Sequence, residues 1–200
     1  LLLLIARGHY KSTLLQVYTI RNLVDFQKRF LYIGGSKDEV SRYTQNVRDQ
    51  IKNNPDILLD YGYLINTERG DTKDELHLIS TMGNASDKDP HLNFSSPPSG
   101  SKGVSKLGGH PHVIIVDDMQ DETITDSEKI RRKHEDWLDR NVLPMRKGKT
   151  KLIIAGTRKD YDDIYAYIKK KKFIPVLEKP AIIKFPNGKE SDYKLVTRYD

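Results

Sequence analysis

A lysine followed by two hydroxyl side chains stands in the segment ARGHYKST, residues 6–13, directly after a short apolar run. In loops of the pattern G-x-x-x-x-G-K-[ST], backbone N–H groups cradle phosphates, the lysine contacts the β- and γ-phosphates, and the hydroxyl ligates Mg²⁺. Lys11 and Ser12 hold the last two positions of this pattern, whereas Ile5 and Tyr10 replace its glycines. The segment predicts an irregular phosphate-binding loop whose phosphate-facing residues are Gly8, His9, Tyr10, Lys11, Ser12 and Thr13.

Paired carboxylates form a second group that could do chemistry, in HVIIVDDMQDE, residues 112–122. Four β-favouring apolar residues end in Asp117 and Asp118, and a strand that ends in carboxylates after such a loop has the form of a Walker B segment. Asp117 would then hold magnesium through water. Taken alone, the two aspartates fit a turn at a strand end equally well, and the upstream loop is what favours a metal site.

The elements that must position these residues alternate between strands and helices, which predicts a mostly parallel sheet covered by helices. Apolar runs and helical spacing predict strands at 1–6, 30–34, 76–80, 112–117 and 151–157, helices at 11–24, 36–53, 125–144 and around 161–168, and closing strands or a hairpin at 180–185 and 193–197. Ser36 with Glu39, and Thr125 with Glu128, form capping boxes. Residues 82–110, rich in Gly, Ser, Pro and Asp, indicate a loop-rich segment.

Polar side chains follow three of the predicted strands. In open parallel sheets the ligand crevice lies beyond the carboxyl ends of the strands, so Lys11, Asp117 and Thr157 are expected to converge there. A lysine at a helix start is otherwise an exposed surface charge. The flanking strand and helix, together with the two aspartates, favour the phosphate-binding interpretation.

Composition describes one soluble α/β domain of 200 residues, with 36% apolar and 31% charged residues. A net charge of +6 favours an anionic partner such as nucleic acid. The lack of cysteine excludes disulfides and thiolate metal sites and suits a reducing compartment. The apolar run at residues 1–6 is too short to span a bilayer and resembles no signal peptide. We expect a cytoplasmic chain without a membrane partner, and, because it begins inside an apolar run, further natural residues upstream.

Four segments together resemble the ATPase half of a terminase large subunit, the DNA-packaging motor of tailed double-stranded DNA viruses. They are ARGHYKST, LYIGGSKDEVSRYTQNVRDQIKNNPDILLDYG, HPHVIIVDDMQDE and LIIAGTRKDYDDIYAYI, and the match touches most of the chain outside residues 60–108. The resemblance implies a single RecA-like P-loop ATPase domain. Its class, called ASCE, has an additional strand between the Walker A and Walker B strands, with helices on both faces of the sheet.

The resemblance also implies roles for individual residues. It assigns γ-phosphate sensing to Arg7, phosphate and magnesium binding to Lys11, Ser12 and Thr13, metal binding to Asp117, water activation to Asp118, and coupling to DNA movement to Gly156 and Thr157. The terminase loop is similarly irregular, with an arginine at the position of Arg7. Without the resemblance, Arg7 is equally well interpreted as a surface charge.

Two features depart from the family pattern. Tyr10 stands where most loops have glycine, and a positive φ at a bulky residue costs roughly 1–2 kcal/mol, so the loop either differs in shape or stores strain. Asp118 is shorter than the usual catalytic Glu, so Glu122 or Asp121 could supply the catalytic carboxylate instead. The family's adenine-contacting segment and its nuclease domain are not among the 200 residues, so we expect this chain not to cleave DNA.

Other residues that could do chemistry have simpler interpretations. His110 and His112 alternate along a strand, a common pattern, so a histidine-bound metal is disfavoured. The run Lys169–Lys172 is interpreted as a solvated helix end, with phosphate contact as the alternative. Packing, and not base stacking, is expected of the aromatic residues Trp137, Tyr161, Tyr165 and Tyr167.

Sequence and resemblance together predict Mg²⁺-dependent ATP hydrolysis that moves double-stranded DNA into a procapsid in the host cytoplasm. The expected partners are DNA, a portal and a small terminase subunit, within a homo-oligomeric ring, usually a pentamer, although the isolated fragment could be monomeric. One alternative is a helicase-type DNA translocase on the same fold. The other is a non-hydrolysing nucleotide- or DNA-binding module in which Tyr10 and Asp118 have disabled catalysis.

Overall fold

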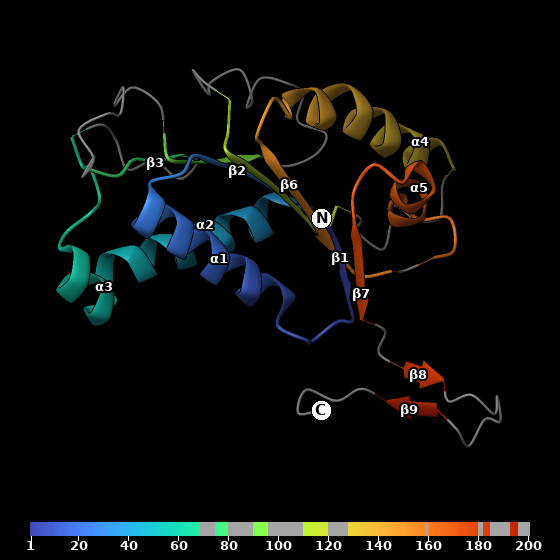
Figure 1. The fold of residues 1–200 in the computed structure, drawn as a ribbon, viewed down its shortest axis with the longest axis horizontal. Helices are drawn as coiled ribbons and strands as arrows, with labels where there is room; N and C mark the ends of the chain where they lie inside the picture. Colours follow the sequence, from blue (N-terminus) through green and yellow to red (C-terminus); the bar gives the residue numbers. More distant parts are fainter. Residues whose placement is uncertain are drawn as a thin grey trace.

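The protein has an α/β architecture around a seven-stranded sheet of order β3-β4-β2-β5-β6-β1-β7 (Figure 1). The computed structural model describes residues 1–68, 75–79, 90–95, 110–119, 128–158, 160–179, 182–184 and 193–195. The strands of this sheet are β1 (Leu2–Ile5), β2 (Phe30–Gly34), β3 (Glu75–Leu76), β4 (Leu92–Ser95), β5 (Val113–Asp117), β6 (Lys151–Gly156) and β7 (Val176–Lys179). The helices are α1 (Lys11–Phe26), α2 (Lys37–Asn53), α3 (Pro55–Tyr61), α4 (Glu128–Trp137) and α5 (Ile164–Lys171).

Parallel pairing joins every neighbouring pair of strands in this sheet except β3 and β4, which are antiparallel. The β6 strand lies between β1 and β5, which is the additional-strand order that the sequence resemblance implied. In the register, Gly34 of β2 pairs with Asp117 of β5, and Leu4 of β1 pairs with Gly156 of β6. The carboxyl ends of these four strands therefore meet at one edge of the sheet.

Helices cover both faces of the sheet, with α1, α2 and α3 on one face and α4 and α5 on the other (Figure 1). Side chains of the strands alternate between two hydrophobic cores, as the pleat of a strand requires. In β5, Val113 and Ile115 belong to the core shared with α1 and α2, whereas Ile114 and Val116 belong to the core shared with α5. The prediction of a mostly parallel sheet between two helical layers is confirmed.

Two strands of the sheet were not predicted. The β4 strand lies inside the segment 82–110, where its four residues are flanked by Gly-, Ser- and Pro-rich sequence, and pairing with β2 holds it in place. The β7 strand is exposed along its length and is fixed by pairing with β1. Residues 80–89 and 96–109 lie outside the described part of the chain, so the rest of the loop prediction stays a prediction.

Several element boundaries also differ from the sequence predictions. The strand expected at 76–80 is shortened to β3, followed by a single bridge between Ile65 and Leu78. The helix expected to reach residue 144 ends as α4 at Trp137 and continues as a π-helical turn, Leu138–Val142, and a 3-10 turn, Leu143–Met145. Its expected start at Thr125 lies outside the described residues.

The C-terminal part of the chain is closer to expectation. Strands β8 (Ile182–Lys184) and β9 (Tyr193–Leu195) pair antiparallel, as predicted for a closing hairpin. Tyr165 of α5 is fully buried, but Tyr161 precedes the helix and is 91% exposed, so the expectation that Tyr161 packs is wrong. Within the described ranges, no helix is long and apolar enough to cross a bilayer.

Side chains cap the two helices that follow β2. The Ser36 hydroxyl accepts a hydrogen bond of 3.2 Å from the backbone N–H of Glu39, which fixes the start of α2 as the capping box predicted. Asn54 ends α2 and caps α3 through the N–H of Asp56, and Pro55 supplies the first residue of that second helix. The sequence had indicated only that α2 stops at this point.

Replacing the cap serine tests how firmly α2 is started. Ser36→Ala is expected to lower the free energy of unfolding by about 1 kcal/mol, because the Glu39 N–H loses its acceptor. Urea denaturation measures the change. Ser41→Ala, at an exposed position inside the same helix, is the matched control and should stay within about 0.5 kcal/mol of the parent. Equal losses in the two variants would contradict a specific role for the cap.

Candidate functional site

The loop between β1 and α1 and the end of β5 come together at the carboxyl edge of the sheet. The ammonium nitrogen of Lys11 lies 2.9 Å from Asp117 Oδ1 and 3.1 Å from Asp118 Oδ2. Lys11 is only 8% exposed and Asp117 only 4%. The interpretation of Lys11 as an exposed helix-start lysine is therefore wrong, and the predicted convergence of Lys11 with Asp117 is observed.

The electrostatics of Lys11 follow from this environment. Burial by itself lowers the pKa of the ammonium group, but the attraction of Asp117 and Asp118 and their hydrogen bonds outweigh it and raise the pKa. Lys11 therefore remains a cation at neutral pH. A cation held at the start of a helix, beside two carboxylates, has the charge needed to bind a phosphate group together with a metal ion.

Two hydroxyl groups bind the Asp117 carboxylate, and a third supports one of them. Ser12 and Tyr32 each donate a hydrogen bond of 3.2 Å to Asp117 Oδ2. The Tyr32 ring stacks on Tyr43 of α2, with ring centroids 3.7 Å apart, and the Tyr43 hydroxyl lies 2.8 Å from that of Thr19 in α1. Burial, followed by the negative charge of Asp117, raises the pKa of Tyr32, so its hydroxyl keeps the proton that it donates.

The loop that leads into α1 contains two residues with positive φ. Gly8 has a φ of 84° and Tyr10 a φ of 55°, so the tyrosine does adopt the left-handed conformation that normally favours glycine. This conformation costs Tyr10 roughly 1–2 kcal/mol. No side chain caps the N-terminus of α1, and its first turn holds no acidic residue, which leaves that end of the helix compatible with an anion.

A pocket of about 290 Å³ opens beside the ion-paired group on the side of α2. Its lining comes from α1, β2, α2 and the end of β5: Ser12, Gln16, Tyr32, Glu39, Arg42, Tyr43, Asn46, Asp117 and Asp118. Burial, and then the charge of Asp118, raise the pKa of Glu39. Sequence reasoning identified Glu39 as a capping residue but missed its place in the site, and it missed Tyr32 entirely, because only the pairing of β2 with β5 brings both beside Asp117.

Buried polar atoms in this group lack ordinary hydrogen-bond partners among the described residues. They are Lys11 Nζ and Asp117 Oδ1, which form an ion pair with each other, and Asp118 Oδ1, the carboxylate oxygen that does not contact Lys11. Such atoms are costly to bury unless a ligand uses them. One ammonium donor and two carboxylate acceptors beside the Ser12 hydroxyl fit the phosphates of a nucleotide and a hard cation such as Mg²⁺.

The other predicted site residues are placed as follows. Arg7 is exposed in the loop, and its role as a γ-phosphate sensor stays a prediction. The Thr157 hydroxyl donates a hydrogen bond of 3.0 Å to the carbonyl of Ile5, which ties the end of β6 to the start of the loop. Gly156 is required by packing, since a Cβ there would lie 2.0 Å from the Tyr165 ring. Asp121 and Glu122 lie outside the described residues.

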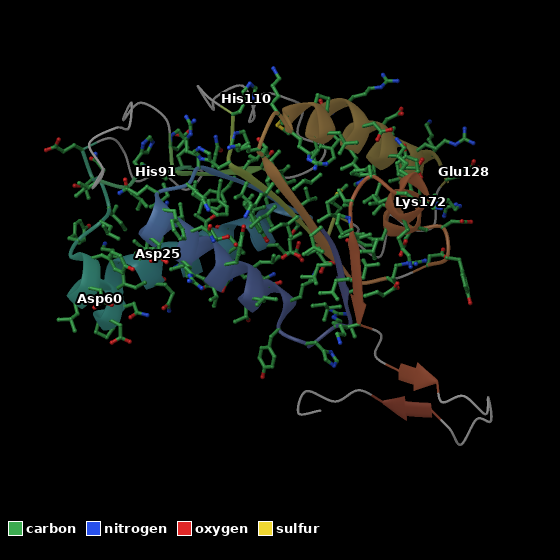
Figure 2. The ribbon with its side chains drawn as sticks, viewed as in Figure 1. Asp25, Asp60, His91, His110, Glu128 and Lys172 are labelled. Carbon is green, nitrogen blue, oxygen red and sulfur yellow. The ribbon has the colours of Figure 1, made fainter. Side chains whose placement is uncertain are left out.

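The histidines and the lysine run take no part in this group. His110 and His112 precede β5, and Figure 2 shows His110 near the top of the view, whereas β1 runs toward the bottom. His112 Nδ1 accepts a hydrogen bond from the Arg29 backbone, and the described residues contain no cluster of three or more acidic or histidine side chains suited to a metal. Three of the lysines in 169–172 form ion pairs, to Glu178, Asp162 and Asp139.

The strand order and the helices on both faces define an α/β protein of the additional-strand class. The N-terminal domain of the DNA packaging ATPase from bacteriophage phi29 is similar, with a TM-score of 0.54 over 92% of this chain and 84% of that one, at 13% identity. A chain of the bacteriophage phi29 genome packaging motor assembly is also similar, with a TM-score of 0.54 and 14% identity, over 93% of this chain.

These similarities show a fold like that of packaging-motor ATPase domains, without singling out the terminases. This chain spans about half of the motor-assembly chain, 51% of its length. No protein-family model matches the sequence. No curated protein matches it either.

Removing the buried cation tests whether it holds this group together. Lys11→Met is expected to lower the free energy of unfolding by about 3 kcal/mol. This is the lower end of the range of about 3–5 kcal/mol for breaking a buried ion pair, because Asp118 is partly exposed. The raised pKa of Lys11 means that the ion pairs contribute at every pH below the unfolded pKa of about 10.4, so the loss should be equal at pH 7 and pH 9.

Urea denaturation of Lys11→Met and of Lys133→Met at both pH values makes the comparison. Lys133 is exposed on α4, so its variant should stay within about 0.5 kcal/mol of the parent. If the two variants lose the same stability, the ion pairs of Lys11 add nothing to the folded state.

Proposed function

We propose that this chain is the ATPase domain of a viral DNA-packaging motor, of the kind found in terminase large subunits. The observation that carries the proposal is the buried Lys11, held between Asp117 and Asp118 directly after a strand and a loop that opens a helix. The similarity to a bacteriophage packaging ATPase domain, at 13–14% identity, shows a fold in which such a site can be placed.

In this proposal, the residues of the loop bind and orient ATP. Lys11 contacts the phosphates, the backbone of residues 8–13 faces them at the helix N-terminus, and Arg7 senses the γ-phosphate. Ser12 and Asp117 would hold Mg²⁺, which neutralises charge on the phosphates when bound. Thr157 would transmit the state of the nucleotide, since it contacts the backbone of Ile5 at the start of the loop.

A carboxylate beyond the strand ends would activate the attacking water. From the sequence, Asp118 is the first candidate and Glu122 or Asp121 the alternatives. In the assembled motor, we propose double-stranded DNA, a portal and a small terminase subunit as partners, in a ring of copies within the host cytoplasm. The net charge of +6 supports a nucleic-acid partner through non-specific attraction.

Steady-state Mg²⁺-dependent ATP hydrolysis tests the proposal. The parent is expected to hydrolyse ATP. The hydrolysis rate of Lys11→Ala should be lower by about 100-fold or more, because the cation that stabilises the phosphate charge is removed. Lys133→Ala, at an exposed position on α4, is the control and should keep the parent rate. A Lys11→Ala variant that hydrolyses ATP as fast as the parent would overturn the phosphate-binding role.

The same assay separates the alternatives. A rate of ATP hydrolysis that rises with double-stranded DNA supports a packaging motor. A rate that rises only with single-stranded DNA favours a helicase-type translocase. A chain that binds ATP tightly but never hydrolyses it, with or without DNA, would favour the non-hydrolysing module.

A further inference from the structure

Glu39 lines the pocket of the proposed site. In the chain it follows β2, whereas the other acidic residues of the pocket follow or end β5. It lines the same pocket as Ser12, Asp117 and Asp118, and it lies in the first turn of α2. The parallel register pairs Gly34 at the end of β2 with Asp117 at the end of β5. The turn that begins α2 therefore lies directly beside the turn that follows β5.

The backbone at Gly35 is where these two turns approach each other. A Cβ atom on Gly35 would lie 2.0 Å from the carbonyl oxygen of Asp118 and 3.1 Å from Glu39 Oε2. The absence of a side chain at Gly35 thus lets the Asp118 backbone and the Glu39 carboxylate lie close to each other. A carboxylate at this place can reach a small molecule in the pocket.

Asp118 and Glu39, two of the three acidic side chains that line the pocket, differ in their partners. Asp118 Oδ2 lies 3.1 Å from the Lys11 ammonium, which occupies one of its oxygens. Glu39 forms no ion pair with a lysine or arginine in the described part of the chain. Arg42 of the same helix acts on Glu39 through its charge without forming an ion pair with it, and a carboxylate that is not ion-paired is the better acceptor for a proton. A pocket of about 290 Å³ holds several waters of roughly 30 Å³ each and is at the lower limit for a whole ligand, roughly 300–1,000 Å³.

We infer that Glu39, in place of Asp118, is the catalytic residue that accepts a proton from the attacking water. The inference rests on the ATP hydrolysis proposed above. The water oxygen forms a bond to the γ-phosphorus while the bond from that phosphorus to the β–γ bridging oxygen breaks, and its electron pair leaves with ADP. The water proton passes to a Glu39 carboxylate oxygen and is released to solvent with the phosphate product.

The competing explanation is that Glu39 serves only to cap α2. Its backbone N–H already bonds the Ser36 hydroxyl, and a glutamate at this position of a capping box reaches back to the first residue. Glutamine caps equally well, so Glu39→Gln keeps the cap and removes the proton acceptor. Asp38→Asn is the matched control: it removes a carboxylate from the same turn, at an exposed position that does not line the pocket.

The experiment measures four quantities for the parent, Glu39→Gln and Asp38→Asn: the rate of Mg²⁺-dependent ATP hydrolysis, the equilibrium affinity for ATP, the midpoint of thermal unfolding, and the identity of the nucleotide bound after incubation with ATP. Glu39→Gln is expected to lose about 100-fold or more in rate. It should keep the ATP affinity and unfolding midpoint of the parent, and it should retain ATP where the parent retains ADP. Asp38→Asn should match the parent throughout, and Glu39→Asp should be intermediate in rate.

Distinct results would overturn the inference. A Glu39→Gln variant that hydrolyses ATP at the parent rate removes the role of Glu39 and leaves the proposed ATPase function standing. If excess Mg²⁺ restores the hydrolysis rate of Glu39→Gln, Glu39 is a metal ligand. If the lower rate of Glu39→Gln is accompanied by a lower midpoint of thermal unfolding, Glu39 serves only as a helix cap. A parent chain that binds no ATP would overturn the proposed function and this inference together.

Discussion

The contact between Lys11 and Asp117 is the interaction on which the rest of the site depends. It joins the first turn of α1 to the end of β5 across β6, which lies between the two strands concerned. A buried cation without a partner would be strongly unfavourable, so the loop, the helix start and the strand end must hold one relative position. The sheet register meets this condition by bringing the carboxyl ends of the strands to one edge.

The aromatic pair behind Asp117 supports the contact from the other side. Tyr32 comes from β2 and Tyr43 from α2, and the hydroxyl of Tyr43 also donates to the carbonyl of Leu15 in α1. The carboxylate is therefore tied to α1 and α2, two of the helices that cover this face of the sheet. Side chains locked in this way by packing and hydrogen bonds hold a site close to its working geometry before a ligand arrives.

Backbone strain accompanies this arrangement at both of its ends. Tyr10 and Asp118 adopt positive φ values of 55° and 48°, one before the lysine and one after the strand. Strain of this kind persists where the surrounding contacts determine the backbone, and it is concentrated at functional sites. Here those contacts are the Lys11 ion pairs and the hydrogen bond from the Asp118 N–H to the carbonyl of Ala155.

The amino-acid sequence by itself determined the alternation of strands and helices, the lysine at a helix start and the carboxylates at a strand end. These are local patterns, since apolar spacing and capping residues act over a few positions. Tertiary structure alone decided that β4 and β7 join the sheet and that Tyr32 and Glu39 lie beside Asp117. Those relations depend on which strands pair and in which register, and no short stretch of sequence contains both partners of such a pair.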